Sequence, residues 1–277
     1  MNALNTLADR GIHLAANLSL MYPDLPFMQR FEACARDGFK GVEILFPYDV
    51  PAIDIAVALQ RNGLELVLIN TPPGSLAQGD RGLLGLPGRE ADFREALERA
   101  ISVAQQTACK RIHLMMGVRD VGEPAEGALD RRRGVVLDNL RHASTELSRA
   151  RLQGLIEPIN TRDIPRYLLN TQQQACELLD ALGDGPISLQ MDFYHCQIVE
   201  GDVVTRLRRH FDRIGHIQIA GVPERCEPWP SELDHGHLFG VLKEVGYAGW
   251  IGCEYRPADE TSGGTSRGLD WIHRVLR

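Results

Sequence analysis

Short apolar runs alternate with longer amphipathic stretches along almost the whole chain. Each short run has the length and apolar content of a buried parallel strand. The longer stretches carry apolar residues at helical spacing, and several end at a glycine, the residue expected just beyond a helix end. The predicted strands are Ile12–Asn17, Gly41–Phe46, Leu64–Asn70, Arg111–Met116, Gly154–Glu157, Ile187–Asp192, His216–Ala220 and Trp250–Glu254. The predicted helices are Pro26–Asp37, Ala52–Asn62, Arg89–Thr107, Arg131–Arg151, Thr171–Leu182, Asp202–Phe211, Asp234–Val245 and Thr265–Val275.

This alternation of strands and helices predicts a closed (β/α)8 TIM barrel of the α/β class. The 277 residues are enough for one such barrel. A doubly wound open sheet that bound a nucleotide would have a glycine-rich phosphate turn after an early strand, and this sequence has none. No linker or low-complexity segment interrupts the pattern. We therefore predict a single domain over residues 1–277, with residues 1–10 as an N-terminal extension.

Composition and charge narrow the range of partners. Apolar residues make up 44% of the chain and charged residues 24%, which is ordinary for a soluble globular protein. The net charge of −7 argues against nucleic-acid binding. No apolar run approaches the roughly 20 residues that cross a bilayer, and the six cysteines lack any CxxC pairing. We expect a cytoplasmic protein with reduced thiols and no membrane partner. The sequence leaves homo-oligomer formation open.

Four predicted strands in the second half of the chain carry an oxygen-bearing side chain at or near their C-terminal ends: Glu157, Asp192, Gln218 and Glu254. Each has a structural explanation when taken singly, such as an ion pair or a helix cap at Asp192. Taken together, they would gather on the catalytic face of the barrel, where the C-terminal ends of the strands meet. Three carboxylates and an amide in one place favour a shared cation, and hard oxygen donors suit Mg²⁺ or Mn²⁺.

Three further residues are candidates for substrate binding. His195 follows the strand that ends at Asp192 and would overhang the same face, as a donor to a substrate oxygen. Arg225 can neutralise a substrate carboxylate or pair at the surface with Glu224 or Glu227. Asn70 ends the third predicted strand and can bind substrate or fix a loop. The expected substrate is a small anion.

A divalent ion flanked by two glutamates suits proton transfer beside a carbonyl. The ion would bind the carbonyl oxygen and the neighbouring hydroxyl, which lowers the pKa of the C–H group and stabilises an enediolate. One glutamate would remove the proton, and a conjugate acid would return it to the adjacent carbon. Nucleophilic catalysis fits less well, since the chain has no Gly-x-Ser-x-Gly elbow and no cysteine with an evident base partner.

Several segments together resemble the hydroxypyruvate isomerase family of xylose isomerase-like barrels, from about Gly11 to the C-terminus. The Glu157-Pro-Ile-Asn160 and Gly252-Cys-Glu-Tyr255 segments, in this order, are specific to that family. The loop Cys226–Glu232 departs from its pattern, and Trp229 and Pro230 are expected to stiffen and fill the loop over the seventh strand. The matching segments are Ala16–Ser19, Gly41–Tyr48, Ile69–Gly74, Pro87–Glu90, Ile156–Asn160, Met191–His195, Gly215–Ala220 and Gly252–Tyr255.

The resemblance implies reversible interconversion of hydroxypyruvate and 2-hydroxy-3-oxopropanoate (tartronate semialdehyde). It implies that Glu157, Asp192, Gln218 and Glu254 hold the metal, that Glu157 and Glu254 form the acid/base pair, and that His195 contacts substrate. A 2-oxo-tetronate isomerase is an open alternative. A sugar epimerase is less favoured, because a histidine ligand is expected there in place of Gln218. The non-enzymatic alternative is a barrel that binds a small molecule and uses the metal structurally.

Overall fold

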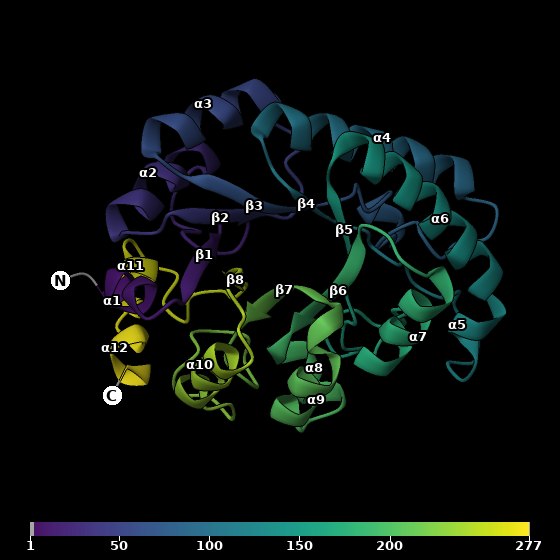
Figure 1. Cartoon of the computed structure of the whole chain (residues 1–277). Helices are drawn as coiled ribbons and strands as arrows, with labels where there is room; N and C mark the ends of the chain where they lie inside the picture. Colours follow the sequence, from purple (N-terminus) through teal and green to yellow (C-terminus); the bar gives the residue numbers. More distant parts are fainter. Residues whose placement is uncertain (1–2, 277) are drawn as a thin grey trace.

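A computed structural model describes residues 3–276 and shows a closed eight-stranded parallel barrel, which confirms the predicted fold (Figure 1). The strands pair in chain order, and the last pairs with the first, so the sheet has no free edge. The strands are β1 (His13–Asn17), β2 (Gly41–Ile44), β3 (Glu65–Asn70), β4 (Arg111–His113), β5 (Gln153–Ile156), β6 (Ile187–Asp192), β7 (Ile214–Ile219) and β8 (Trp250–Cys253).

The helices lie outside the barrel and cover its strands (Figure 1). Their apolar faces pack on the strands, which read as nearly continuous apolar runs because they are covered on both sides. The longer helices are α2 (Phe27–Asp37), α3 (Ala52–Asn62), α4 (Glu90–Thr107), α6 (Arg133–Ala150), α7 (Gln172–Leu182), α9 (Val203–His210) and α10 (His235–Glu244). The short ones are α1 (Ala3–Asp9), α5 (Ala128–Arg131), α8 (Phe193–Val199), α11 (Gly264–Gly268), α12 (Trp271–Val275), η1 (Leu76–Gln78) and η2 (Phe211–Arg213).

Three differences between the predicted elements and the structure are the most important. Strand β4 ends at His113 rather than Met116, because the chain then leaves the sheet and Met116 pairs with Gly82 and Gly85 of a loop. The last predicted helix is two short helices, α11 and α12. Helix α8 directly follows Asp192, where the sequence predicted no helix, and the Asp192 side chain caps it by accepting the N–H of Tyr194.

The N-terminal extension takes part in the fold. Helix α1 lies beside α12, so the first and last helices meet at one side of the barrel (Figure 1). Leu4 and Leu7 of α1 are buried in the main hydrophobic core. All six cysteines are unpaired. Within residues 3–276, no helix has the length and hydropathy that crossing a bilayer requires.

Candidate active site

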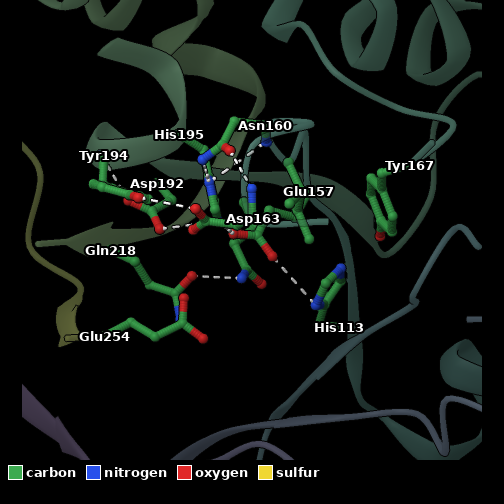
Figure 2. A network of polar contacts seen from close by, with 12 residues as sticks. His113, Glu157, Asn160, Asp163, Tyr167, Asp192, Tyr194, His195, Gln218 and Glu254 are labelled. Carbon is green, nitrogen blue, oxygen red and sulfur yellow. Dashed lines mark hydrogen bonds and ion pairs between the residues drawn. The ribbon is translucent and has the colours of Figure 1, made fainter. Parts of the chain in front are cut away.

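Four buried side chains converge at the C-terminal ends of the strands: Glu157, Asp192, His195 and Glu254. One ligand atom from each lies within 4.8 Å of the others. Glu157 directly follows β5, Asp192 ends β6 and Glu254 directly follows β8, while His195 lies in the first turn of α8. Figure 2 shows these side chains pointing toward one another. The three predicted carboxylates are therefore neighbours in space, although 97 residues separate the first from the last.

Asp192 both caps a helix and presents an oxygen to the site, the two roles that the sequence presented as alternatives. Its Oδ1 accepts the N–H of Tyr194 at 2.8 Å and caps α8. Its Oδ2 is buried and has no hydrogen-bond partner among the described residues. Burial raises the pKa of the Asp192 carboxyl to about 6, against the opposing charge of Arg225. The free oxygen of Asp192 is thus available to a ligand.

Glu157 and Glu254 are equally enclosed. Burial, and after it the charges of Glu254 and Asp192, raises the pKa of Glu157 well above its ordinary value. Burial raises the pKa of Glu254 to about 8, although Arg225 opposes this. Glu157 Oε1 has no hydrogen-bond partner in the described part of the chain. Three such carboxyls cannot all be charged without compensation.

The residues present therefore fit a hard divalent cation. Glu157 Oε1 and Asp192 Oδ2 accept no hydrogen bond from residues 3–276, and buried polar groups normally have such partners. Oxygen donors of this kind suit Mg²⁺ or Mn²⁺. A bound cation would satisfy these oxygens and favour the ionised carboxylates.

His195 belongs to a hydrogen-bond network that decides which ring nitrogen carries the proton. The Oδ1 of Asn160 accepts the backbone N–H of Asp163 at 2.8 Å, so Nδ2 of Asn160 faces Nδ1 of His195 at 2.7 Å (Figure 2). Burial, followed by the charge of Arg225, holds the pKa of His195 well below its ordinary value, so the ring is neutral. A neutral ring that accepts at Nδ1 carries its proton on Nε2. Nη2 of Arg225 also lies 3.4 Å from Nε2. Because a guanidinium only donates, this contact is not a hydrogen bond while Nε2 carries the proton.

Arg225 points into the site. Its Nη1 donates to Asp163 at 3.0 Å, and its Nη2 donates to Glu254 at 2.9 Å. These contacts replace the surface pairing with Glu224 or Glu227 that the sequence left open. Although burial disfavours its charge, the surrounding carboxylates, Glu254 first, hold the pKa of Arg225 above its ordinary value. Arg225 therefore stays charged and anchors one member of the predicted acid/base pair.

Gln218 lies inside β7, in register with Asp192 on β6. Its Nε2 donates to Oε2 of Glu43 at 2.8 Å, and its Oε1 accepts from Nε2 of Gln190 at 2.6 Å. The amide is fully buried in this chain of hydrogen bonds. An amide oxygen has a second lone pair, so the contact with Gln190 leaves Oε1 able to bind a cation.

A cavity of about 320 Å³ opens above these groups. Glu157, His195, Arg225 and Glu254 line it, and so does Asn70 at the end of β3. This is the position expected for the active site of a TIM barrel, at the C-terminal face. Trp229 does not line this cavity; its indole is half exposed and packs against the guanidinium of Arg274.

The family model of xylose isomerase-like TIM barrels matches residues 31–275. The chain belongs to this family. It is 48% identical to the 2-oxo-tetronate isomerase of Cupriavidus necator over 262 residues, which cover 95% of this chain and 98% of the relative. It is 38% identical to the hydroxypyruvate isomerase of Escherichia coli, over 94% of this chain and 98% of the relative. A crystal structure from Brucella melitensis, described as AP endonuclease, family 2, is 38% identical and superposes with a TM-score of 0.88, covering 95% of this chain and 98% of that one.

These relatives confirm the resemblance to hydroxypyruvate isomerases and make the chain an isomerase of the xylose isomerase-like family. A non-enzymatic barrel, the other class that the sequence left open, does not agree with them.

Sequence reasoning missed three residues of this isomerase site. His113 ends β4, and its Nδ1 lies 3.4 Å from Oε2 of Glu157; burial lowers its pKa to about 3, so it is neutral. The predicted strand continued to Met116, which placed His113 inside the strand instead of at its end. Arg81 and Arg256 also line the cavity. Arg256 could have been found, because it lies two residues after Glu254 and alternate residues of an extended chain share a face.

Proposed function

We propose that this isomerase moves the carbonyl group of a small 2-oxo acid from carbon 2 to carbon 3, with hydroxypyruvate as the substrate and tartronate semialdehyde as the product. A proton leaves carbon 3 and one is delivered to carbon 2, while the hydroxyl proton passes from the oxygen of carbon 3 to that of carbon 2. The carbonyl group acidifies the neighbouring C–H, and the shared intermediate is an enediolate.

The observation that carries this proposal is the pair of buried carboxyls, Glu157 and Glu254, on either side of the β6 and β7 ends. Both are buried at the C-terminal face of the barrel, where a carboxyl group can exchange a proton with a substrate carbon. In our mechanism, one takes the proton from carbon 3 and the other supplies the proton to carbon 2. Arg225 holds Glu254 in place through the 2.9 Å hydrogen bond.

The chain's other groups would orient the substrate and stabilise negative charge on it. His195 would donate from Nε2 to a substrate oxygen, since its Nδ1 is committed to Asn160. Glu157, Asp192, Gln218 and Glu254 would hold Mg²⁺ or Mn²⁺. When bound, such a cation supplies Lewis-acid stabilisation of the substrate oxygens.

The carboxylate of the substrate needs a cationic partner. Arg225 is largely engaged by Asp163 and Glu254, although its buried Nε–H has no partner within the described residues. Arg81 and Arg256 line the same cavity, and within the described chain neither makes an ion pair with a carboxylate. We assign them to the substrate carboxylate, with Arg225 and the amide of Asn70 contributing further hydrogen bonds.

A 2-oxo-tetronate is the second candidate substrate. Two observations favour it: the identity of 48% to the 2-oxo-tetronate isomerase, and a cavity of about 320 Å³, which leaves room beyond a three-carbon acid. The reaction would be the same, because a 2-oxo-tetronate also carries its carbonyl group on carbon 2 and a hydroxyl on carbon 3. The catalytic residues therefore serve either substrate without rearrangement.

Hydrogen exchange tests the proposal directly. The chain loaded with Mn²⁺ is incubated with hydroxypyruvate in D₂O, and NMR should show deuterium entering carbon 3. Glu157→Gln and Glu254→Gln should each abolish isomerisation, and the variant that lacks the base for carbon 3 should also abolish the exchange, while thermal unfolding changes little. Glu244→Gln, which alters an exposed glutamate paired with Arg208, is the matched control and should exchange normally.

Isomerisation retained in either active-site variant, or exchange at carbon 3 retained in both, would refute the acid/base roles given to the two glutamates. An absence of exchange with both hydroxypyruvate and 2-oxo-tetronate in the wild type would refute the proposed reaction. Relative kcat/KM values for these two acids decide which of them is the substrate.

A further inference from the structure

A buried carboxylate lies inside the barrel, below the candidate active site. Glu43 of β2 is only 1% exposed, and three buried side chains surround its two oxygens. His216 Nε2 lies 2.6 Å from Oε1, while Gln218 Nε2 donates to Oε2 at 2.8 Å and Asn17 Nδ2 donates to it at 3.4 Å. Glu43 is thus the acceptor on which donors from β1 and β7 converge.

This arrangement is costly for a barrel interior. TIM barrels usually fill this space with branched apolar side chains, and a buried carboxylate destabilises the fold unless its partners compensate. The backbone makes room for it as well. A Cβ at Gly252 of β8 would lie 2.1 Å from Oε1 of Glu43, so that position admits only glycine while the carboxylate is in place. Such a costly group suggests a function beyond packing.

The hydrogen bond to Glu43 decides which end of the Gln218 amide faces the carboxylate. A carboxylate only accepts, so the NH₂ group of Gln218 must face Glu43. The amide oxygen of Gln218 then points the other way, toward β6, where it accepts from Gln190 at 2.6 Å. Asp192 lies on the same strand, two residues after Gln190 and in register with Gln218. Glu43 therefore decides that an oxygen, not an NH₂ group, faces β6.

We propose that Glu43 is a positioning residue that holds the amide of Gln218 in the orientation in which its oxygen faces the metal-binding carboxylates. The inference rests on the proposed function, in which Gln218 is a metal ligand, and extends it to a residue that touches neither substrate nor metal. Groups behind a metal ligand commonly orient it in this way, and their removal weakens metal binding.

The substitution Glu43→Gln tests whether Glu43 orients the amide of Gln218. The new amide offers one oxygen and one NH₂ group where the carboxylate offered two acceptors, so His216 and Gln218 compete for the single oxygen. Wherever the NH₂ group faces Gln218, the amide of Gln218 rotates and presents its own NH₂ group toward β6. That group cannot bind a cation. The side chain keeps its size, so the packing changes little.

Calorimetric titration of the full, metal-free chain with Mn²⁺ tests the proposal without relying on activity. Glu43→Gln should raise the Kd roughly 10- to 100-fold. Gln218→Met removes the ligand and should weaken binding by a similar factor. In the double variant, Glu43→Gln should add less than about threefold, because residues that act through one another are not additive.

Glu123→Gln serves as the matched control. Glu123 forms a largely buried ion pair with Arg132 outside the barrel, so this variant loses stability without a change in Mn²⁺ affinity. Circular dichroism verifies the fold of each variant. If Glu43→Gln does not fold, Glu43→Asp replaces it in the same titrations, alone and combined with Gln218→Met. The shorter side chain moves the carboxylate away from Gln218.

The positioning role would be overturned if Glu43→Gln bound Mn²⁺ with the wild-type Kd, or if the two substitutions raised the Kd independently in the double variant. Either result would leave the metal site intact. A wild-type chain that binds no Mn²⁺ would be a different failure. It would refute the metal centre itself, and this inference with it.

Discussion

Arg225 donates a hydrogen bond to Glu254 across 2.9 Å, and the two side chains come from consecutive loops that follow β7 and β8. The same guanidinium contacts Asp163 at 3.0 Å, so it bridges a loop after β5 to the end of β8. A bidentate guanidinium fixes two carboxylates better than an ammonium group can. In our proposal, this bridge keeps one catalytic carboxyl in the correct place.

Replacing Arg225 should therefore damage catalysis more than folding. Arg225→Gln removes the charged donor to Glu254, and we expect kcat for hydroxypyruvate to fall at least about 10-fold, as for the loss of a properly placed acid or base. Arg267→Gln breaks an exposed pair with Asp259 and is the control, with no change expected. Steady-state kinetics of both variants measures the change in kcat. An Arg225 variant with wild-type kcat would show that the bridge does not serve catalysis.

Asn160 should act through the tautomer of His195. Asn160→Asp turns the donor that faces Nδ1 into an acceptor, which moves the ring proton to Nδ1 and leaves a lone pair on Nε2. We expect kcat to fall roughly 100-fold, as when a transition-state donor is lost, while Mn²⁺ still binds. Nitrogen NMR of the imidazole reports the tautomer directly. A proton that remains on Nε2 in the variant would contradict this explanation.

Arg256 should affect substrate binding rather than the chemical step. Arg256→Gln removes a charged partner of the substrate carboxylate, and a charge-assisted hydrogen bond contributes about 1.5–3 kcal/mol. We expect KM for hydroxypyruvate to rise roughly 10-fold or more with kcat nearly unchanged. Turnover of dihydroxyacetone, which has no carboxylate, should be affected much less. Equal losses for both compounds would assign Arg256 a role other than carboxylate binding.

His235, at the start of α10, should make the fold sensitive to acid. It is 1% exposed, and burial lowers its pKa to about 4. The unfolded chain takes up a proton there below about pH 6.5 while the folded chain does not, so stability is full above that pH and falls as the pH drops toward 4. The total effect is about 3 kcal/mol.

Urea unfolding at several pH values checks this prediction. The free energy of unfolding should decline less between pH 7 and pH 5 in His235→Asn than in the wild type. Other buried histidines titrate in both proteins, so the difference between the two curves isolates His235. Parallel curves would mean that His235 does not contribute to the acid sensitivity.

The sequence predicted the strands near the site well where the hydrophobic pattern lay within one short segment. The runs that end at Asp192 and Glu254 were apolar and short enough to be strands, and the fold placed their ends together as parallel strands require. Helix α8 was missed because Phe193–Val199 is short and its start depends on a cap from Asp192, a residue also read as a metal ligand. His113 was missed because the apolar pattern continued past the true end of β4.

The barrel, the order of its strands and the three carboxyl side chains at the strand ends could be predicted from the residues alone. These features follow from periodicity, which each segment carries in its own residues. The partners of Arg225, the contacts of His195 and the hydrogen bond between Glu43 and Gln218 became known only from the fold. Gln218 and Glu43 are 175 residues apart, and whether two such side chains meet depends on barrel closure and register. No local pattern records that information.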